Sequence, residues 1–331
     1  MILGNGFSID LIQKLNKTDN INLSNLFVFG DQVCFPKTKE KGFLSAKYCP
    51  NLWALGANST NNNKLSTQIV NNIITCANVY NLSQKSTINS DSENNIYLKA
   101  YFELSSYLRY LFIYYNSFIS DEELKEVSAK LPLILYIKSS IDAGEQVNII
   151  TYNYDIWLER LLQLNDLDFS INGFETSKKL IDIYKPHGSI SFSFKTKVND
   201  SAPYKIKIAT DDIAQETKDF DVVYNFENDY PIVNSLIPPS GDSNRFPYGW
   251  IGKIRENLSS CIKASKSGDE LIIIGISYWH VDRNEIDDIL ININPNIDLK
   301  YVNPYPPADF NAVLSSLFKN YIHYKSGDFI I

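Results

Sequence analysis

The N-terminal run Met1-Ile2-Leu3-Gly4-Asn5-Gly6-Phe7 decides the fold class, because it places a short apolar strand directly before a glycine turn. Apolar residues at helical spacing follow from Phe7 to Leu15, so the pattern predicts a strand, a tight turn and a helix. Backbone N–H groups and the helix dipole at such a turn can hold a phosphate. The dinucleotide fingerprint has a third glycine where this chain has Ile9, so a plain strand-to-helix turn is an equal alternative.

The alternation of strand and helix returns in the second half of the chain. Apolar runs predict strands at Val147–Ile150, Leu271–Ile274 and Ile297–Val302. Amphipathic patterns predict helices at Ile156–Leu164 and Phe310–Phe318. Strands that are apolar throughout and alternate with helices indicate a parallel sheet covered on both faces. We therefore expect an α/β fold, a Rossmann-like parallel sheet with helices on both faces plus a helical insertion.

Residues 58–144 interrupt this alternation and are expected to form the insertion. Residues 1–57 and 145–331 would then form the core. Two polar stretches rich in Asn and Ser, Asn58–Lys64 and Ser83–Asn95, have loop composition and flank a short apolar segment. Residues 193–244 are irregular and punctuated by proline, and their sequence predicts no particular structure.

Within the insertion, Ile96–Phe118 is dense in Tyr, Leu and Phe and predicts a long helix. Ser120 and Glu123 have the spacing of a capping box for a second helix, and we expect the two helices to pack on each other. Aromatic and apolar residues occupy nearly all faces of the first helix. This pattern predicts an uncovered patch that mediates homo-oligomer or partner contact, with burial against the sheet as the alternative.

The composition of the chain argues against several classes of function. The 331 residues are 44% hydrophobic and carry a net charge of -7, which favours a globular core and argues against an extended nucleic-acid surface. The chain has no signal region and no apolar run of about 18 residues, so we expect neither secretion nor membrane insertion. Four scattered cysteines have no zinc-ligand spacing, which predicts free thiols in a cytoplasmic protein and no bound metal.

Polar residues follow the strand predicted at Val147–Ile150 and the apolar segment Leu180–Ile183. Asn153 and Asp155 lie in the run Thr-Tyr-Asn-Tyr-Asp at residues 151–155, and Asp155 could simply cap the next helix. His187 lies in Lys-Pro-His-Gly-Ser at residues 185–189, between a proline that fixes the approach and a glycine that permits close backbone contact. A single histidine is more often structural than catalytic, and here we weigh the two roles equally.

Further polar sites follow the C-terminal strands. Gly275 and Ser277 follow the most apolar strand, and Asn303 follows the next one, where it could bind a ribose hydroxyl or cap a turn. Asp282 and Glu285 have the spacing of a second capping box. Because the carboxyl ends of parallel strands meet at one edge of a sheet, we expect the strand-end sites to converge on one crevice.

Taken in chain order, these motifs resemble the sirtuin superfamily, and more closely the SIR2-like NAD-hydrolysing proteins of bacterial anti-phage defence. The resemblance covers about residues 1–55 and 145–310. It rests on five elements: Gly-Asn-Gly-Phe-Ser at residues 4–8, Thr-x-Asn-x-Asp at 151–155, His-Gly-Ser at 187–189, Gly-x-Ser at 275–277, and Asn303.

The resemblance implies a role for each of these positions. Five residues of the first turn would line the phosphates of NAD+: Gly4, Asn5, Gly6, Phe7 and Ser8. Three residues would hold the adenosine half: Gly275, Ser277 and Asn303. Asn153 and His187 would face the nicotinamide ribose as catalytic residues, with Asp155 supporting Asn153.

The chain departs from deacylating sirtuins, which carry two C-x-x-C zinc pairs and a Gly-Ile-Pro-Asp-Phe-Arg loop. Both are missing, so the resemblance implies that water is the acceptor and that NAD+ is cleaved to nicotinamide and ADP-ribose. Such an NADase would deplete NAD+ in abortive infection, in response to a phage-derived trigger. The sequence has no phosphate-binding loop for ATP, so any ATPase partner would be a separate chain.

Two alternatives to an NADase remain open. The chain could be a non-catalytic module that senses NAD+ or ADP-ribose and signals to a partner protein. It could also be an abortive-infection protein of different chemistry that shares the Gly-Asn-Gly-Phe start and binds no NAD+.

Overall fold

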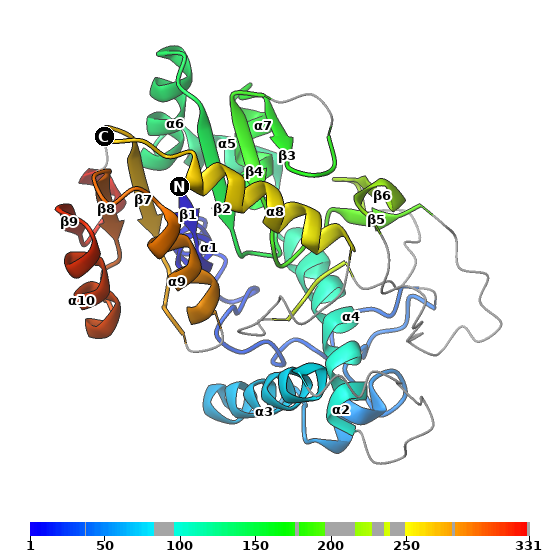
Figure 1. Cartoon of the computed structure of the whole chain (residues 1–331). Coiled ribbons are helices and arrows are strands. Elements are labelled where there is room, and N and C mark those ends of the chain that lie inside the picture. The colour runs from blue at the N-terminus through cyan, green and yellow to red at the C-terminus, as the bar shows by residue number, and fades with distance from the viewer. Residues whose placement is uncertain are drawn as a thin grey trace.

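The computed structural model describes residues 1–36, 38–82, 96–175, 179–195, 216–226, 235–238, 249–279 and 282–329. A seven-stranded parallel sheet flanked by helices lies at its centre, which confirms the predicted Rossmann-like α/β fold (Figure 1). In spatial order the strands are β3 (Phe169–Ile171), β4 (Ile181–Tyr184), β2 (Val147–Thr151), β1 (Ile2–Leu3), β7 (Glu270–Ile274), β8 (Asp298–Val302) and β9 (Asn320–Tyr324).

The first strand holds the centre of the sheet although it has only two residues. Ile2 pairs with Ile150 of β2 on one side and with Ile273 of β7 on the other. On one side of β1 lie β2, β4 and β3, and on the other lie β7, β8 and β9. After β2 the chain forms the edge strand β3 and then places β4 between β3 and β2. Parallel sheets bind their ligands outside the carboxyl ends of the strands, at the point where the strand order reverses. In this chain that point lies beside Gly4, directly after β1.

Ten helices are described: α1 (Asn5–Lys14), α2 (Pro50–Ala54), α3 (Asn63–Leu82), α4 (Ile96–Asn116), α5 (Asp121–Ser128), α6 (Pro132–Asp142), α7 (Trp157–Leu164), α8 (Gly249–Lys263), α9 (Arg283–Asn292) and α10 (Ala308–Leu317). Short 3-10 turns cover Thr217–Asp219 and Gly327–Phe329. A separate antiparallel pair joins β5 (Phe192–Phe194) to β6 (Phe220–Val222). Figure 1 shows α8 and α9 across the near face of the sheet and α1 behind it.

The prediction of an uncovered patch on the first insertion helix is wrong, because this helix, α4, is buried within its own chain. Most of its tyrosines, including Tyr101, Tyr107 and Tyr115, are buried. The Tyr107 hydroxyl donates to the Leu26 carbonyl at 2.7 Å, and the Ser105 hydroxyl donates to the Leu236 carbonyl at 2.6 Å. The aromatic faces of α4 therefore pack against segments far away in the sequence, and they give no support for an oligomer surface.

The rest of the insertion also differs from its expected form. The segment expected to be short and apolar is the 20-residue helix α3, which packs on α4 together with α2. The capping box of Ser120 and Glu123 is confirmed, but it begins the eight-residue α5, which packs on α7. The loop prediction at 83–95 and most of the irregular region 193–244 lie outside the described residues.

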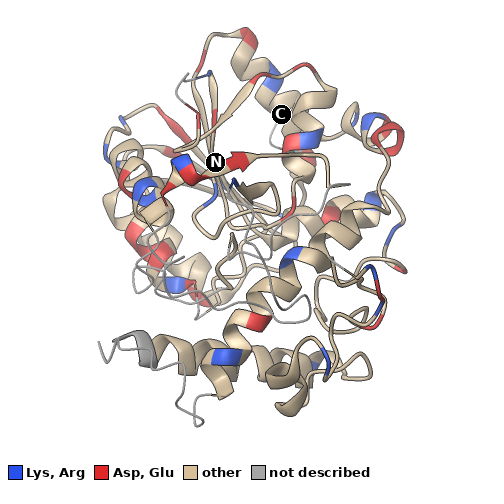
Figure 2. Ribbon diagram, turned by 90° about the vertical axis from the view of Figure 1, so that its right-hand side faces the viewer, with Lys and Arg blue, Asp and Glu red and all other residues tan. Residues whose placement is uncertain are grey.

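Charged side chains are spread over the fold. Figure 2 shows acidic and basic residues interspersed along the ribbons, in keeping with the net charge of -7. Among the helices described, none combines the length and the apolar character that crossing a bilayer requires.

Candidate functional site

A cavity of about 510 Å³ lies at the carboxyl ends of the parallel strands. The loops after β1, β2, β4 and β7 contribute Gly4, Asn153, His187 and Ser277 to its lining. Ligand cavities typically enclose about 300–1,000 Å³, so the volume is that of a small-molecule site. The sheet therefore brings four of the predicted strand-end sites to one place.

The glycine turn after β1 is shaped by contact with the loop after β7. The Gly4 N–H donates to the Ile274 carbonyl at 2.9 Å, and the Gly6 N–H donates to the Gly275 carbonyl at 3.0 Å. A Cβ on Gly6 would lie 2.5 Å from the Gly275 Cα, so only glycines permit this approach. These two N–H groups are thus already used within the chain. Whether the turn also binds phosphate stays a prediction.

The remaining residues of the turn divide between the cavity and the core. Asn5 is exposed and lines the cavity with Gly4. Phe7 is buried in the hydrophobic core, where it holds α1 against the sheet. The side chain of Ser8 is fully buried and bonds to residues after β2. The hydroxyl of Ser8 therefore bonds within the chain and helps to position the residues that follow β2.

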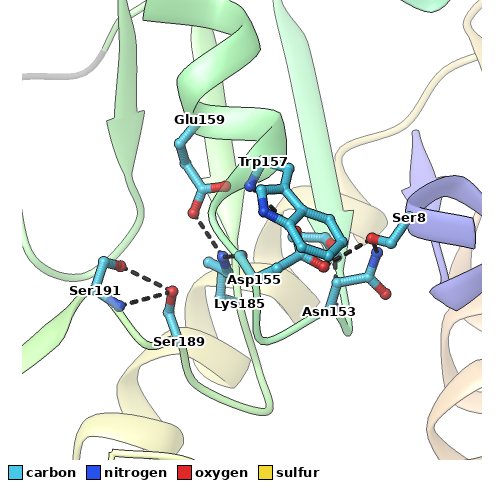
Figure 3. Close-up of polar contacts among 9 residues, drawn as sticks. Ser8, Asn153, Asp155, Trp157, Glu159, Lys185, Ser189 and Ser191 are labelled. Atoms are coloured by element: carbon cyan, nitrogen blue, oxygen red, sulfur yellow. Dashed lines mark hydrogen bonds and ion pairs between the residues drawn. The ribbon is translucent and has the colours of Figure 1, made fainter. Parts of the chain in front are cut away.

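Ser8, Asn153 and Asp155 form a buried hydrogen-bonded cluster (Figure 3). The Asn153 amide nitrogen donates to the Gly4 carbonyl at 3.0 Å and to the Ser8 hydroxyl oxygen at 2.9 Å. The Ser8 hydroxyl donates in turn to Asp155 Oδ2 at 2.7 Å. Both amide hydrogens of Asn153 are thereby engaged, and Figure 3 shows its Oδ1 pointing away from Ser8. The cluster fixes Asn153 with a hydrogen-bond acceptor still available.

Asp155 also bonds to the first turn of α7, through the Trp157 N–H at 3.2 Å. The capping contact that the sequence suggests therefore exists beside the contact with Ser8. Burial raises the pKa of Asp155 to about 6, although the nearby Lys185 ammonium and the Ser8 hydroxyl both favour the charged form. The carboxyl group of Asp155 accepts the hydrogen bond of the Ser8 hydroxyl and so holds this hydroxyl in place.

A buried ion pair joins the loop after β4 to helix α7, which follows β2. Lys185 Nζ lies 2.5 Å from Glu159 Oε1, and it also donates to the Asp155 carbonyl at 2.6 Å (Figure 3). Both side chains are fully buried. Because buried charges are costly to leave unpaired, Lys185 holds the His187 loop against α7, and its bond to the Asp155 carbonyl connects that loop to the Asn153 loop.

His187 is buried at the cavity wall and bonds to the first turn of α9. Its Nε2 lies 3.0 Å from Glu285 Oε2, and Arg255 lies 3.4 Å from the other carboxylate oxygen. The Tyr152 ring meets the imidazole edge to face, with centroids 4.8 Å apart. Burial would lower the pKa of His187, but the carboxylates of Glu285 and Asp282 outweigh it and raise the pKa above its ordinary value.

The predicted capping box of Asp282 and Glu285 is wrong. Asp282 is the N-cap residue of α9 but makes no side-chain capping bond, and Glu285 bonds to His187 instead. Asp282 lines the cavity, and its Oδ1 is buried with no hydrogen-bond partner among the described residues. Burial raises the pKa of Asp282 to about 6, with the neighbouring His187 acting against this. Asp282 is thus a lining residue with one buried carboxylate oxygen that has no partner in the described part of the chain.

The loop after β7 reaches the cavity, whereas Asn303 does not. Ser277 is exposed and lines the cavity, and the next residue, Tyr278, has a left-handed backbone with φ 51°. Asn303 Nδ2 donates to the Tyr301 hydroxyl oxygen at 2.8 Å and, more weakly, to the Ile276 carbonyl at 3.3 Å. Its Oδ1 accepts from the Tyr305 N–H. Asn303 thus supports the loop after β7 and is not among the lining residues.

Gly188 fixes the backbone of the histidine loop, and its substitution is expected to be costly. Its φ is +84°, and an added Cβ would lie 2.0 Å from the Ser235 carbonyl oxygen. Gly188→Ala should destabilise the fold by more than the roughly 1–3 kcal/mol of left-handed strain alone. Gly144→Ala is the matched control, since Gly144 has φ +78° with nothing within 4 Å of an added Cβ. Urea unfolding of both variants measures the difference, and equal losses would contradict it.

Sequence reasoning missed several residues of this site. Lys185 and Tyr152 belong to the same short motifs as His187 and Asn153, but the motifs alone give them no role. Glu285 and Asp282 had a usable signal, because they follow a strand that ends at the carboxyl edge of the sheet. Helix α3 also lines the cavity, through Ser66, Thr67 and Val70. No sequence pattern indicates this contribution, since it depends on how the insertion packs over the core.

Within the described residues, no three side chains of His, Cys, Asp or Glu are grouped so that they could hold a metal ion. A scan of protein-family models finds no match to this chain, and a search of curated proteins finds no relative. The resemblance to SIR2-like proteins therefore rests on the motifs alone and stays a prediction.

Proposed function

We propose that this chain is an NAD+ glycohydrolase that cleaves the bond between nicotinamide and ribose to give nicotinamide and ADP-ribose. One observation carries the proposal: Asn153 and His187, which the SIR2-like resemblance assigns to catalysis, line one cavity at the switch point of a parallel sheet. Gly4, Asn5 and Ser277, assigned to NAD+ binding, line the same cavity. Its volume of about 510 Å³ suits a small-molecule ligand.

The reaction requires little acid catalysis. Nicotinamide is a cationic group in NAD+, so it leaves with the electron pair of the N-glycosidic bond and becomes neutral. The ribose carbon then carries positive charge, which nearby carboxylates stabilise. Asp282 suits this role, because its Oδ1 is buried at the cavity with no partner in the described part of the chain.

Asn153 would orient the attacking water and the ribose hydroxyls. Its NH2 group is held by Gly4 and Ser8, which leaves Oδ1 to accept a hydrogen bond from water. A rigidly held acceptor positions the water without reorganisation during the reaction. The buried cluster with Ser8 and Asp155 is the support that such positioning needs.

His187 would remove the proton from that water. If Nε2–H donates to Glu285, the other ring nitrogen, Nδ1, is a free base. As the water oxygen bonds to the ribose carbon, its proton passes to Nδ1 and Glu285 stabilises the imidazolium. The products are then neutral nicotinamide and ADP-ribose, and the proton leaves to solvent.

The contact between His187 and Glu285 predicts a change in pH dependence. The Glu285 carboxylate raises the pKa of His187, so activity should fall with decreasing pH as the imidazole takes up a proton. Glu285→Gln removes the charge, and burial then lowers the pKa, so the acid limb should move to lower pH. The pH profile of kcat/KM measures this. Glu256→Gln, an exposed residue of α8, is the control; an unmoved acid limb in Glu285→Gln would contradict the assignment.

Release of nicotinamide from NAD+ by the purified chain tests the proposal directly. Release above the uncatalysed rate would support it. Binding of NAD+ or ADP-ribose without turnover, also in the presence of candidate partners and phage-derived triggers, would favour the sensing module. Absence of both binding and turnover under these conditions would leave the third alternative, a defence protein of different chemistry.

The proposed biological role is depletion of NAD+ in anti-phage defence by abortive infection. This role follows from the resemblance, as do a phage-derived trigger and a separate ATPase or other partner chain. Loss of cellular NAD+ after phage challenge, in cells that express this chain, would test it.

A further inference from the structure

One wall of the cavity comes from outside the strand-end loops. Helices α3 and α4 of the insertion supply it together with the segment around Leu23 of the core. Figure 1 shows α3 packed against α4, below the ends of the parallel strands. The insertion is therefore part of the cavity.

This wall carries mainly apolar side chains: Leu23, Leu26, Val70, Leu108 and Phe112. Phe112 meets the Tyr154 ring edge to face, with centroids 5.6 Å apart. Because Tyr154 follows Asn153 directly, the apolar wall lies beside the loop that would hold the attacking water. A ligand group bound there would be next to the reacting bond.

Three polar residues also line this wall: Ser24, Ser66 and Thr67. Ser24 and Thr67 are exposed, whereas Ser66 of α3 is buried. It is 2% exposed and lines the cavity, and its Oγ finds no hydrogen-bond partner among the described residues. A buried hydroxyl without a partner costs free energy. A ligand atom that bonds to Ser66 would remove this cost.

We propose that α3 and α4 form the pocket for the nicotinamide ring and that the Ser66 hydroxyl donates a hydrogen bond to its carboxamide oxygen. The inference rests on the proposed function. Nicotinamide is a flat ring with one polar substituent, which matches a mainly apolar wall whose one buried hydroxyl has no partner among the described residues. The adenosine half would extend the other way, toward Gly275 and Ser277.

Titration of the purified chain with nicotinamide and, separately, with ADP-ribose tests this assignment without turnover. Ser66→Ala should weaken nicotinamide binding by up to about 10-fold, the fold-change of a single hydrogen bond, and leave ADP-ribose binding unchanged. Its melting temperature should not fall, because the lost hydroxyl had no partner in the described part of the protein. Ser66→Cys, which keeps the shape of the side chain with a slightly larger atom and donates only weakly, should also weaken nicotinamide binding.

Ser106→Ala is the matched control. Ser106 lies on α4, is also 2% exposed, and its Oγ likewise lacks a partner within the described chain, but it does not line the cavity. Its substitution should leave the binding of both ligands unchanged.

The outcomes separate this inference from the proposed function. Unchanged nicotinamide binding in Ser66→Ala, or an equal loss for both ligands, would overturn the Ser66 assignment while NADase activity stands. Selective loss of nicotinamide binding in a chain that never hydrolyses NAD+ would support Ser66 and overturn the NADase. A wild type that binds neither ligand would overturn both.

Discussion

Asn153→Ala is expected to lower NAD+ hydrolysis by about 100-fold or more, because a fixed acceptor for the attacking water is lost. The substitution also leaves the Gly4 carbonyl and the Ser8 hydroxyl without their shared donor. We therefore expect a cost in stability of about 1–3 kcal/mol, which a folded chain can tolerate. Initial rates of nicotinamide release, together with circular dichroism and urea unfolding, measure both effects.

Asn172→Ala is the matched control for this variant. Asn172 follows β3 as Asn153 follows β2, and its side chain bonds to Asp182 and Asn257. It does not line the cavity, so its loss should cost stability while the rate stays near that of the wild type. A folded Asn153→Ala variant with the turnover of the wild type would overturn the assignment of Asn153.

His187→Ala is expected to lower the rate by about 10²–10⁴-fold, the usual contribution of a general base. The loss should be greatest near neutral pH and should shrink as hydroxide replaces the missing base at high pH. Removing the imidazole also leaves the Glu285 carboxylate without its buried partner. Rates of nicotinamide release from pH 5 to 9 measure the effect.

His323→Ala controls for the loss of a histidine. His323 lies on the outer strand β9, where its Nε2 is 2.8 Å from the Asn303 carbonyl oxygen, and it does not line the cavity. It should leave the pH profile unchanged. If His187→Ala folds and keeps the acid limb of the wild type, His187 is not the titrating base.

Four of the seven strands of the central sheet, β1, β2, β7 and β8, could be predicted from the sequence because their signal is local, whereas β3, β4 and β9 were not predicted. The apolar runs that form β2 and β7 mark parallel strands by composition alone, and even the two residues of β1 are located by the glycine turn after them. Once parallel strands are predicted, their carboxyl ends must lie at the same edge of the sheet. For the same reason the sequence alone is sufficient to expect Asn153 and His187 at one edge of the sheet.

The errors concern contacts between segments that are distant in the sequence. The faces of α4 look unpartnered in sequence, but Arg109 donates to the Phe192 carbonyl and Ser105 donates to the Leu236 carbonyl, both more than 80 residues away. Glu285 fits a capping box by spacing, and only the position of His187 across the cavity shows its actual partner. Local patterns do not contain this information.

The burial of α4 limits how this protein can change during evolution. An insertion that merely sits on a core can be exchanged, lengthened or lost without disturbing the chemistry beneath it. Here Leu108 and Phe112 face the cavity, while Tyr107 and Arg109 of the same helix bond to other segments of the chain. Selection for a different ligand and selection for folding therefore act on neighbouring positions of one helix, and new specificity must evolve by small substitutions in place.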